Sequence, residues 1–136
     1  EHFSTVDIAI AAAAVADFKP RMVGKQKIKK DVGIQSIELD NTQDILAQMG
    51  KLKQKQFLVG FALETEDEKN NAIKKIKSKN LDAIVLNSLN DSGAGFSLDS
   101  NKVTYIQKNE TIIPFELKSK RLVAKDIFSQ ILIQNA

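Results

Sequence analysis

The sequence contains no cysteine and no tryptophan, and His2 is its single histidine. Disulfide bonds, thiolate nucleophiles and cysteine-ligated metal sites are therefore excluded. One histidine, at the second position, rules out both a histidine metal cluster and a Ser-His-Asp triad within this chain. Any chemistry must therefore use carboxylates, lysines, backbone groups or a borrowed Mg2+.

Long apolar runs are missing as well. The longest covers residues 8–16, well short of the roughly 20 residues that a membrane-spanning helix needs. We expect no membrane contact and a cytoplasmic location. The 136 residues, 43% hydrophobic and 27% charged, are instead typical of one globular domain with a core of its own.

Arginine is scarce, since only two of the 20 basic residues are arginine, and the net charge is +3. A mild basic excess suits anionic ligands such as phosphates, although it is also common on domains that bind none. We do not expect nucleic-acid binding, because no aromatic residues are interleaved with the basic patch.

Three apolar stretches, residues 6–15, 57–63 and 81–86, predict buried strands of a parallel sheet. Residues 17–33 contain proline, two glycines and a lysine cluster, and they predict a loop. Residues 34–39 alternate apolar and polar, as a short half-exposed strand does.

Two helices are predicted between the apolar strands. Asn41 or Thr42 would cap the first helix. Thr65 and Glu68 have the capping-box spacing for the second, which would run to about Asn80. Strands and helices that alternate in this way predict an α/β fold with a doubly wound, mostly parallel, Rossmann-like sheet in a single domain over residues 1–136.

The last third of the chain predicts a β-hairpin and a helix. Residues 102–107 and 111–116 are short strands around the turn residues Asn109 and Glu110. Ser119 would open an amphipathic helix. Its buried side would hold Leu122, Val123, Ile127 and Ile131, with Leu132 as a further candidate.

The end of the first predicted strand is a candidate ligand site, because ligands of open α/β sheets lie beyond the carboxyl ends of the strands. Residues 11–14 are alanines, so a ligand could approach the backbone closely. Asp17 could accept a hydrogen bond from a base amino group or hold a hydrated cation. The simpler interpretation is that the alanines fit beneath a helix and that Asp17 caps a turn.

A lysine cluster follows within about ten residues of that strand end. Its members are Lys25, Lys27, Lys29 and Lys30. Such a cluster suits phosphate binding, and nearby glycines would let the loop close over a ligand. A solvated run of charge is the alternative, and lysines alone do not decide between the two.

The second predicted helix has lysines beside its apolar stripe of Ala72, Ile73 and Ile76. Lys75 and Lys79 lie four residues apart and share one edge of that stripe. They could bind one anion together, or simply extend over the core. Phe61 follows Gly60 near the end of the second strand, where it could belong to the core or flank a base.

These stretches together resemble the phosphopantothenate–cysteine ligase family, also called phosphopantothenoylcysteine synthetase, over nearly the whole chain. The first and fourth stretches are the most specific. The matching residues are Ala13-Ala14-Val15-Ala16-Asp17-Phe18, Lys27-Ile28-Lys29-Lys30, Asp44-Ile45-Leu46, Gly60-Phe61-Ala62-Leu63-Glu64-Thr65, Lys77-Ser78-Lys79-Asn80-Leu81-Asp82, and Gly95-Phe96 with Asp99 and Asn101.

The resemblance implies a reaction in coenzyme A biosynthesis. The carboxylate of 4′-phosphopantothenate attacks the α-phosphate of CTP to give an acyl-cytidylate, and the amine of cysteine then displaces CMP. Mg2+ accompanies CTP. By position, Lys27 matches a lysine that acts in turnover of the acyl-cytidylate, and Asp17 matches the aspartate of the cytidine site, where it is also our candidate to contact the metal. Further CTP contacts are implied for Ala11, Ala12, Ala13, Lys27, Gln43, Asp44, Ile45, Leu46, Phe61, Lys75 and Lys79.

The sequence also departs from the family. Gln43 stands where members often have proline, and the family's N-terminal glycine-rich segment is absent. Because the chain begins with Glu1 and no signal-like segment follows, we expect a fragment that lacks the N-terminal half of the ligase domain and that need not be active alone. The resemblance further implies a homodimer, and FMN only in a fused decarboxylase domain that is not present here. The alternative is another nucleotide-binding α/β domain without ligase activity, although no Gly-x-Gly-x-x-Gly motif supports it, and a non-enzymatic binding module comes third.

Overall fold

The computed structural model describes residues 2–24, 26, 36–88 and 98–135. The chain divides into two compact units. The first, which we call the sheet unit, comprises Glu1–Ala12 and Leu46–Ala136, and the second, the ribbon unit, comprises Ala13–Ile45. Within the described residues, no helix is long and apolar enough to cross a membrane.

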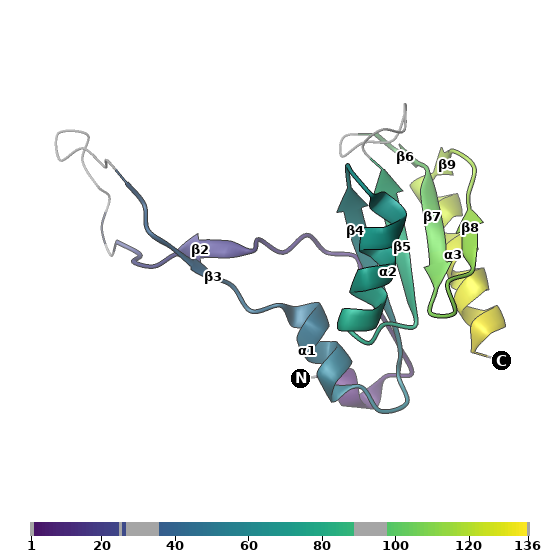
Figure 1. Cartoon of the computed structure of the whole chain (residues 1–136), viewed down its shortest axis with the longest axis horizontal. Helices are drawn as coiled ribbons and strands as arrows, with labels where there is room; N and C mark the ends of the chain where they lie inside the picture. The colour runs from purple at the N-terminus through teal and green to yellow at the C-terminus, as the bar shows by residue number, and fades with distance from the viewer. Residues whose placement is uncertain (1, 25, 27–35, 89–97, 136) are drawn as a thin grey trace. The chain divides into compact units, whose positions relative to one another are not determined.

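The sheet unit contains a five-stranded sheet in the order β1-β4-β5-β7-β8 (Figure 1). β1 pairs with β4 and β4 with β5 in parallel, whereas β7 and β8 are antiparallel to their neighbours. The α/β class predicted from the sequence is thereby confirmed. The strands are β1 (Ile8–Ala11), β4 (Phe57–Glu64), β5 (Ala83–Ser88), β7 (Val103–Gln107) and β8 (Ile112–Pro114).

Helices cover both faces of this sheet (Figure 1). They are α1 (Ile45–Leu52) and α2 (Glu68–Ser78) on one face and α3 (Lys120–Gln134) on the other. Alternate residues of each strand point to opposite faces, so Leu58 and Ala62 of β4 pack beneath α2 while Phe57 and Val59 pack beneath α3. The other elements among the described residues of the unit are short: a 3-10 turn (Phe3–Thr5) and the paired strands β6 (Ser100–Asn101) and β9 (Lys118–Ser119).

The first strand is shorter and more exposed than predicted. β1 covers only Ile8–Ala11, and residues 12–16 are exposed. β1 has β4 on one side and lies at the edge of the sheet, so Ile10 keeps 43% of its surface exposed. The prediction of a strand buried on both faces over residues 6–15 was therefore wrong, because apolar composition alone does not distinguish an edge strand from a central one.

Both helix starts also differ from prediction. α1 begins at Ile45, since Asn41 belongs to strand β3 and the Thr42 amide donates to a carbonyl at 2.9 Å. α2 begins at Glu68 after Asp67, which has φ 45° and no side-chain capping bond. The N-cap is therefore Asp67, two residues after the predicted Thr65.

The end of α2 is a Schellman motif, in which a residue with positive φ closes the helix. Asn80 has φ 52°, and the Leu81 amide donates to the Ile76 carbonyl at 3.0 Å. The side chains of Leu81 and Ile76 belong to the same buried cluster. This arrangement turns the chain sharply from α2 into β5.

The predicted hairpin and last helix are confirmed. β7 and β8 pair around a turn in which Glu110 has φ 68°. Ser119 caps α3 by accepting a hydrogen bond from the Leu122 amide at 3.4 Å. Val123, Ile127 and Ile131 are buried, but the expected Leu122 and Leu132 are 48% and 51% exposed, because a buried stripe with a spacing of four residues is too narrow to include them.

In the part of the ribbon unit that the structure describes, two short strands, β2 (Phe18–Pro20) and β3 (Leu39–Asn41), pair antiparallel. Residues 18–20 were predicted as loop and instead form a strand, since their partner is distant in the sequence. Arg21 closes the pair through ion pairs with Glu38 and Asp40 at 3.0 and 2.8 Å. The strand expected at residues 34–39 begins only at Leu39, with residues 34 and 35 outside the described part.

Candidate functional site

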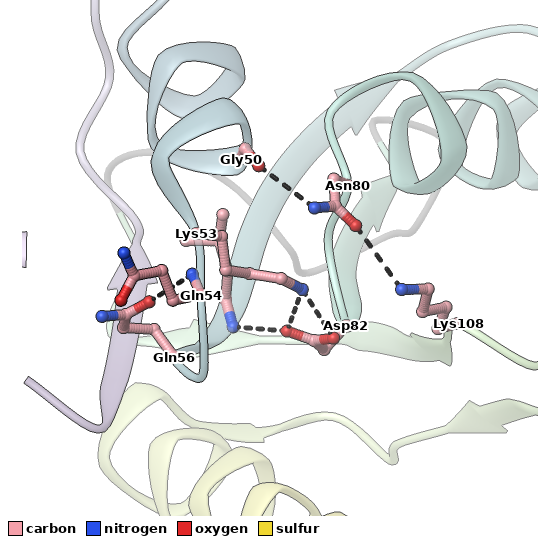
Figure 2. A network of polar contacts seen from close by, with 8 residues as sticks. Gly50, Lys53, Gln54, Gln56, Asn80, Asp82 and Lys108 are labelled. Atoms are coloured by element: carbon pink, nitrogen blue, oxygen red, sulfur yellow. Dashed lines mark hydrogen bonds and ion pairs between the residues drawn. The ribbon is translucent and has the colours of Figure 1, made fainter. Parts of the chain in front are cut away.

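The amino ends of β4 and β5 hold a network of polar side chains (Figure 2). The Lys53 ammonium donates to both carboxylate oxygens of Asp82, at 2.8 and 2.7 Å. Asp82 Oδ2 also accepts the Leu58 amide at 2.8 Å. The Lys53 side chain is only 9% exposed. Its ammonium is therefore buried against Asp82 and is not accessible to a ligand.

The same network ties neighbouring segments together (Figure 2). Asn80 Nδ2 donates to the Gly50 carbonyl at 3.1 Å, and Lys108 Nζ reaches Asn80 Oδ1 at 3.5 Å. A Cβ at Gly50 would lie 1.8 Å from the Lys79 carbonyl oxygen, so only glycine allows α1 to approach the end of α2 this closely. The polar side chains at this end of the sheet bind one another and the backbone, so they stabilise the fold.

Tyr105, like Lys53 and Asp82, stabilises the fold. It is fully buried, its hydroxyl donates to Gln134 Oε1 at 2.5 Å, and its ring stacks on Phe115 with centroids 6.4 Å apart. Burial, with a smaller contribution from the Asp82 charge, raises the pKa of Tyr105 to about 12. The phenol is therefore neutral at physiological pH and is no candidate for acid–base chemistry.

Polar side chains also lie at the carboxyl ends of β4 and β5. Glu64, the last residue of β4, accepts from the Lys75 ammonium at 2.5 Å. Ser88, the last residue of β5, donates to Glu68 at 2.5 Å. The Lys75 side chain is 41% exposed, so its ammonium can still meet a ligand. This is the end at which α/β sheets bind ligands.

The predicted edge lysines of α2 lie as expected. Lys75 and Lys79 are half-buried beside buried Ala72 and Ile76, whereas Lys74 is exposed. Lys79, however, is the C-cap of α2, at the end of the helix that leads into β5. A ligand that contacts both lysines would therefore extend along α2 rather than lie only at the strand ends.

Phe61 and Leu46 have different surroundings. The Phe61 side chain packs with the cluster beneath α3, on the face opposite to α2 and its lysines. A Cβ at Gly60 would lie 2.8 Å from Leu46 Cδ2 and 2.9 Å from Leu81 Cδ1, so these side chains are what press against Gly60. Leu46 therefore has a packing role, and the structure does not bring Phe61 onto the face of the lysines.

The other predicted residues divide between the two units. In the sheet unit, Ala11 is paired with Gly60 in the parallel ladder and Ala12 is exposed. In the ribbon unit, Ala13, Asp17, Gln43, Asp44 and Ile45 are all exposed. Among the described residues the Asp17 carboxylate has no polar partner, while its backbone carbonyl accepts from Thr42. Lys27 lies outside the described residues, as do Lys25, Lys29 and Lys30.

Sequence reasoning missed three polar residues at the carboxyl ends of the strands, namely Glu64, Glu68 and Ser88. Glu64 offered a usable signal, since it is a charged residue on an otherwise apolar strand and has the same parity as inward-facing Leu58 and Ala62. Ser88 and Glu68 gave none, because their contact joins segments 20 residues apart.

Comparison with known proteins identifies the family of this chain. A family model described as the DNA/pantothenate metabolism flavoprotein C-terminal domain matches residues 1–134. The chain is 56% identical over 133 residues to a "Cysteine/Cysteine sulfinic acid decarboxylase" of an unknown prokaryotic organism, covering 97% of the chain and 37% of that protein. It is 43% identical over 129 residues to the "Coenzyme A biosynthesis bifunctional protein CoaBC" of Bacillus subtilis (strain 168), covering 95% and 32%.

A solved structure, the C-terminal domain of a coenzyme A biosynthesis bifunctional protein CoaBC, matches with a TM-score of 0.75 and 38% identity. The match covers 98% of the chain and 59% of that structure. The chain spans about a third of the length of the curated relatives above. It belongs to the family of the DNA/pantothenate metabolism flavoprotein C-terminal domain, with the C-terminal domain of CoaBC among its homologues.

Proposed function

We propose that this chain is the nucleotide-binding part of a CTP-dependent phosphopantothenate–cysteine ligase, within a longer protein of coenzyme A biosynthesis. The single observation that carries the proposal is the accessible Lys75 ammonium beside Glu64 at the carboxyl end of β4, in a chain of the CoaBC family. At the amino end of the strands, Lys53 and Asp82 are paired with each other and Lys53 is buried. We therefore assign ligand binding to the carboxyl end.

The electrostatic problem of the reaction accounts for lysines at this site. A carboxylate of 4′-phosphopantothenate must approach the α-phosphate of CTP, and pyrophosphate must leave with its added charge. In this proposal Lys75 and Lys79 bind the phosphates and stabilise that charge. Lys27 acts in the second step, in which the amine of cysteine attacks the acyl-cytidylate and CMP departs.

The backbone supplies the remaining contacts in this proposal. The exposed alanines after β1 let the nucleotide approach the main chain, and Asp17 contacts the cytidine. Gln43, Asp44 and Ile45 stand at the start of α1, where the helix dipole favours anions. Phe61 would reach the ligand from the other face of the sheet.

Mg2+ fits the available donors through the nucleotide rather than through a protein cage. The described residues contain no group of three or more acidic or histidine side chains placed to hold a metal. Mg2+ commonly binds one or two carboxylates together with substrate phosphates. The exposed Asp17 carboxylate suits that role, and the metal would supply neutralisation of the phosphate charge.

The ribbon unit supports a proposed homodimer. Its Phe18, Met22 and Val23 side chains are 57%, 86% and 84% exposed, and exposed apolar groups of this kind favour contact with another chain. We place FMN in a separate decarboxylase domain. The decarboxylase name of one relative describes a protein of which this chain covers 37%, so it does not assign decarboxylation to this part.

Thermal stabilisation tests the proposal against the alternative of an unrelated nucleotide-binding domain. With CTP and Mg2+ in excess over the dissociation constant, the full-length protein should melt several degrees higher, since a ligand at about 100 times its Kd stabilises by roughly 2.7 kcal/mol. ATP and NAD at the same concentration should shift the melting temperature less. Equal shifts, or none, for all three would refute the ligase proposal.

A further inference from the structure

Glu64 is a charged residue at the end of a strand that is otherwise apolar. β4 reads Phe-Leu-Val-Gly-Phe-Ala-Leu-Glu, and its first four residues are buried. Glu64 has the parity of Leu58 and Ala62, so it faces α2, and its side chain is only 14% exposed. A carboxylate so placed needs a partner, because burial of an unpaired charge is costly.

That partner is the Lys75 ammonium, at 2.5 Å. Side chains of a helix lean toward its N-terminus, and the N-terminus of α2 follows the end of β4, so the Lys75 side chain is directed back to Glu64. An ammonium has three donors, and Glu64 takes one. With 41% of the Lys75 side chain exposed, the other donors can bind an anion.

A contribution to folding stability does not by itself explain why Glu64 and Lys75 are paired here. A lysine–carboxylate pair with one partner well exposed adds little to folding. A lysine that must bind phosphate, in contrast, gains from being held in one conformation beforehand, because ordering its long side chain otherwise opposes binding. The acidic partner sits where it can do that ordering.

We propose that Glu64 is a positioning residue that holds the Lys75 ammonium in place for the phosphates of the nucleotide. The inference rests on the proposed function. Positioning of Lys75 requires a hydrogen-bond acceptor at position 64 more than it requires a negative charge. Glutamine there can still accept one hydrogen bond from Lys75, although a weaker one.

The test is a double-mutant cycle on the full-length protein, with the KM for CTP and kcat as readouts. Glu64→Ala should raise the KM for CTP about tenfold, equivalent to loss of a charge-assisted hydrogen bond, with kcat changed less than about twofold. Glu64→Gln should recover most of that loss. In a Lys75→Met background, Glu64→Ala should have no further effect, because the group that it positions is gone.

Asp126→Ala is the matched control. Asp126 pairs with Lys118 at 2.7 Å and lies on α3 beneath the other face of the sheet. The two lysine side chains have similar exposure, 38% for Lys118 and 41% for Lys75, although Asp126 is more exposed than Glu64, at 34% against 14%. This variant should leave the KM for CTP unchanged.

Additive effects of Glu64→Ala and Lys75→Met would overturn the inference, as would a Glu64→Gln variant as weak as Glu64→Ala. If Glu64→Ala fails to fold, Glu64→Leu, which keeps the bulk of the side chain but accepts no hydrogen bond, replaces it in the same cycle, with additive effects again as the contrary result. Failure of the proposed function is a separate outcome, recognised when the wild-type protein neither binds nor turns over CTP.

Discussion

The two ends of the central strands each hold a lysine–carboxylate pair, and the pairs differ in what surrounds them. Lys53 gives two hydrogen bonds to Asp82 and is 9% exposed, whereas Lys75 gives one to Glu64 and is 41% exposed. Asp82 also accepts a backbone amide of β4. The pair at the amino end is therefore part of the buried structure, whereas the lysine of the pair at the carboxyl end keeps contact with solvent.

The largest predicted effect is at the amino end. Asp82→Ala should lower the free energy of unfolding by about 3 kcal/mol, because it leaves the buried Lys53 ammonium and the Leu58 amide without their acceptor. Urea unfolding of the variant and the wild-type chain measures this loss. A loss below about 1 kcal/mol would remove the distinction between the two ends.

The next effect is alkaline destabilisation through Tyr105. Its pKa is about 12 in the folded chain and about 10 in an unfolded one. Its contribution to stability is complete below pH 10 and is lost as the pH rises toward 12, by about 2–3 kcal/mol for a shift of this size. Tyr105→Phe should flatten that part of the pH dependence in unfolding experiments, while losing about 1 kcal/mol from the hydrogen bond to Gln134. An unchanged alkaline profile would contradict the assignment.

A smaller effect on stability is expected at the carboxyl end. Glu64→Gln should change the free energy of unfolding by about 1 kcal/mol or less, because half-exposed ion pairs add little. Denaturation under the conditions used for Asp82→Ala provides the comparison. If the two variants lose equal stability, the carboxyl-end pair is as structural as the other.

The smallest effect calibrates the series. Asp126→Ala breaks a surface pair with Lys118 and should cost less than about 1 kcal/mol. Measured alongside the others, it shows how much of each loss belongs to burial rather than to charge pairing.

Most helices and strands could be predicted from the sequence, but few of the pairings between strands could. Periodicity placed β4, α2 and β5 because buried stripes follow from local spacing. Ile10 could not be recognised as an edge residue, since exposure at a sheet edge depends on neighbours that are not local. The start of α2 at Glu68 was missed for a related reason, because composition does not reveal the left-handed backbone conformation of its N-cap, Asp67.

The candidate site was predictable in part. Helical spacing predicted that Lys75 and Lys79 share one edge of α2. It did not predict that Lys79 lies at the end of the helix that leads into β5, because that depends on where α2 stops. Phe61 could be located on its strand, yet which helix it faced required the register of the sheet. Glu64 was readable by parity, and its contact with Lys75 emerged only from the packing of α2.

Calorimetric titration of CTP with Mg2+ into the full-length protein tests the central claim most directly. The account predicts tighter binding of CTP than of ATP, and an affinity about tenfold weaker in Lys75→Met, equivalent to roughly 1.4 kcal/mol. Equal affinities for CTP and ATP, or a Lys75→Met variant that binds CTP like the wild type, would contradict it.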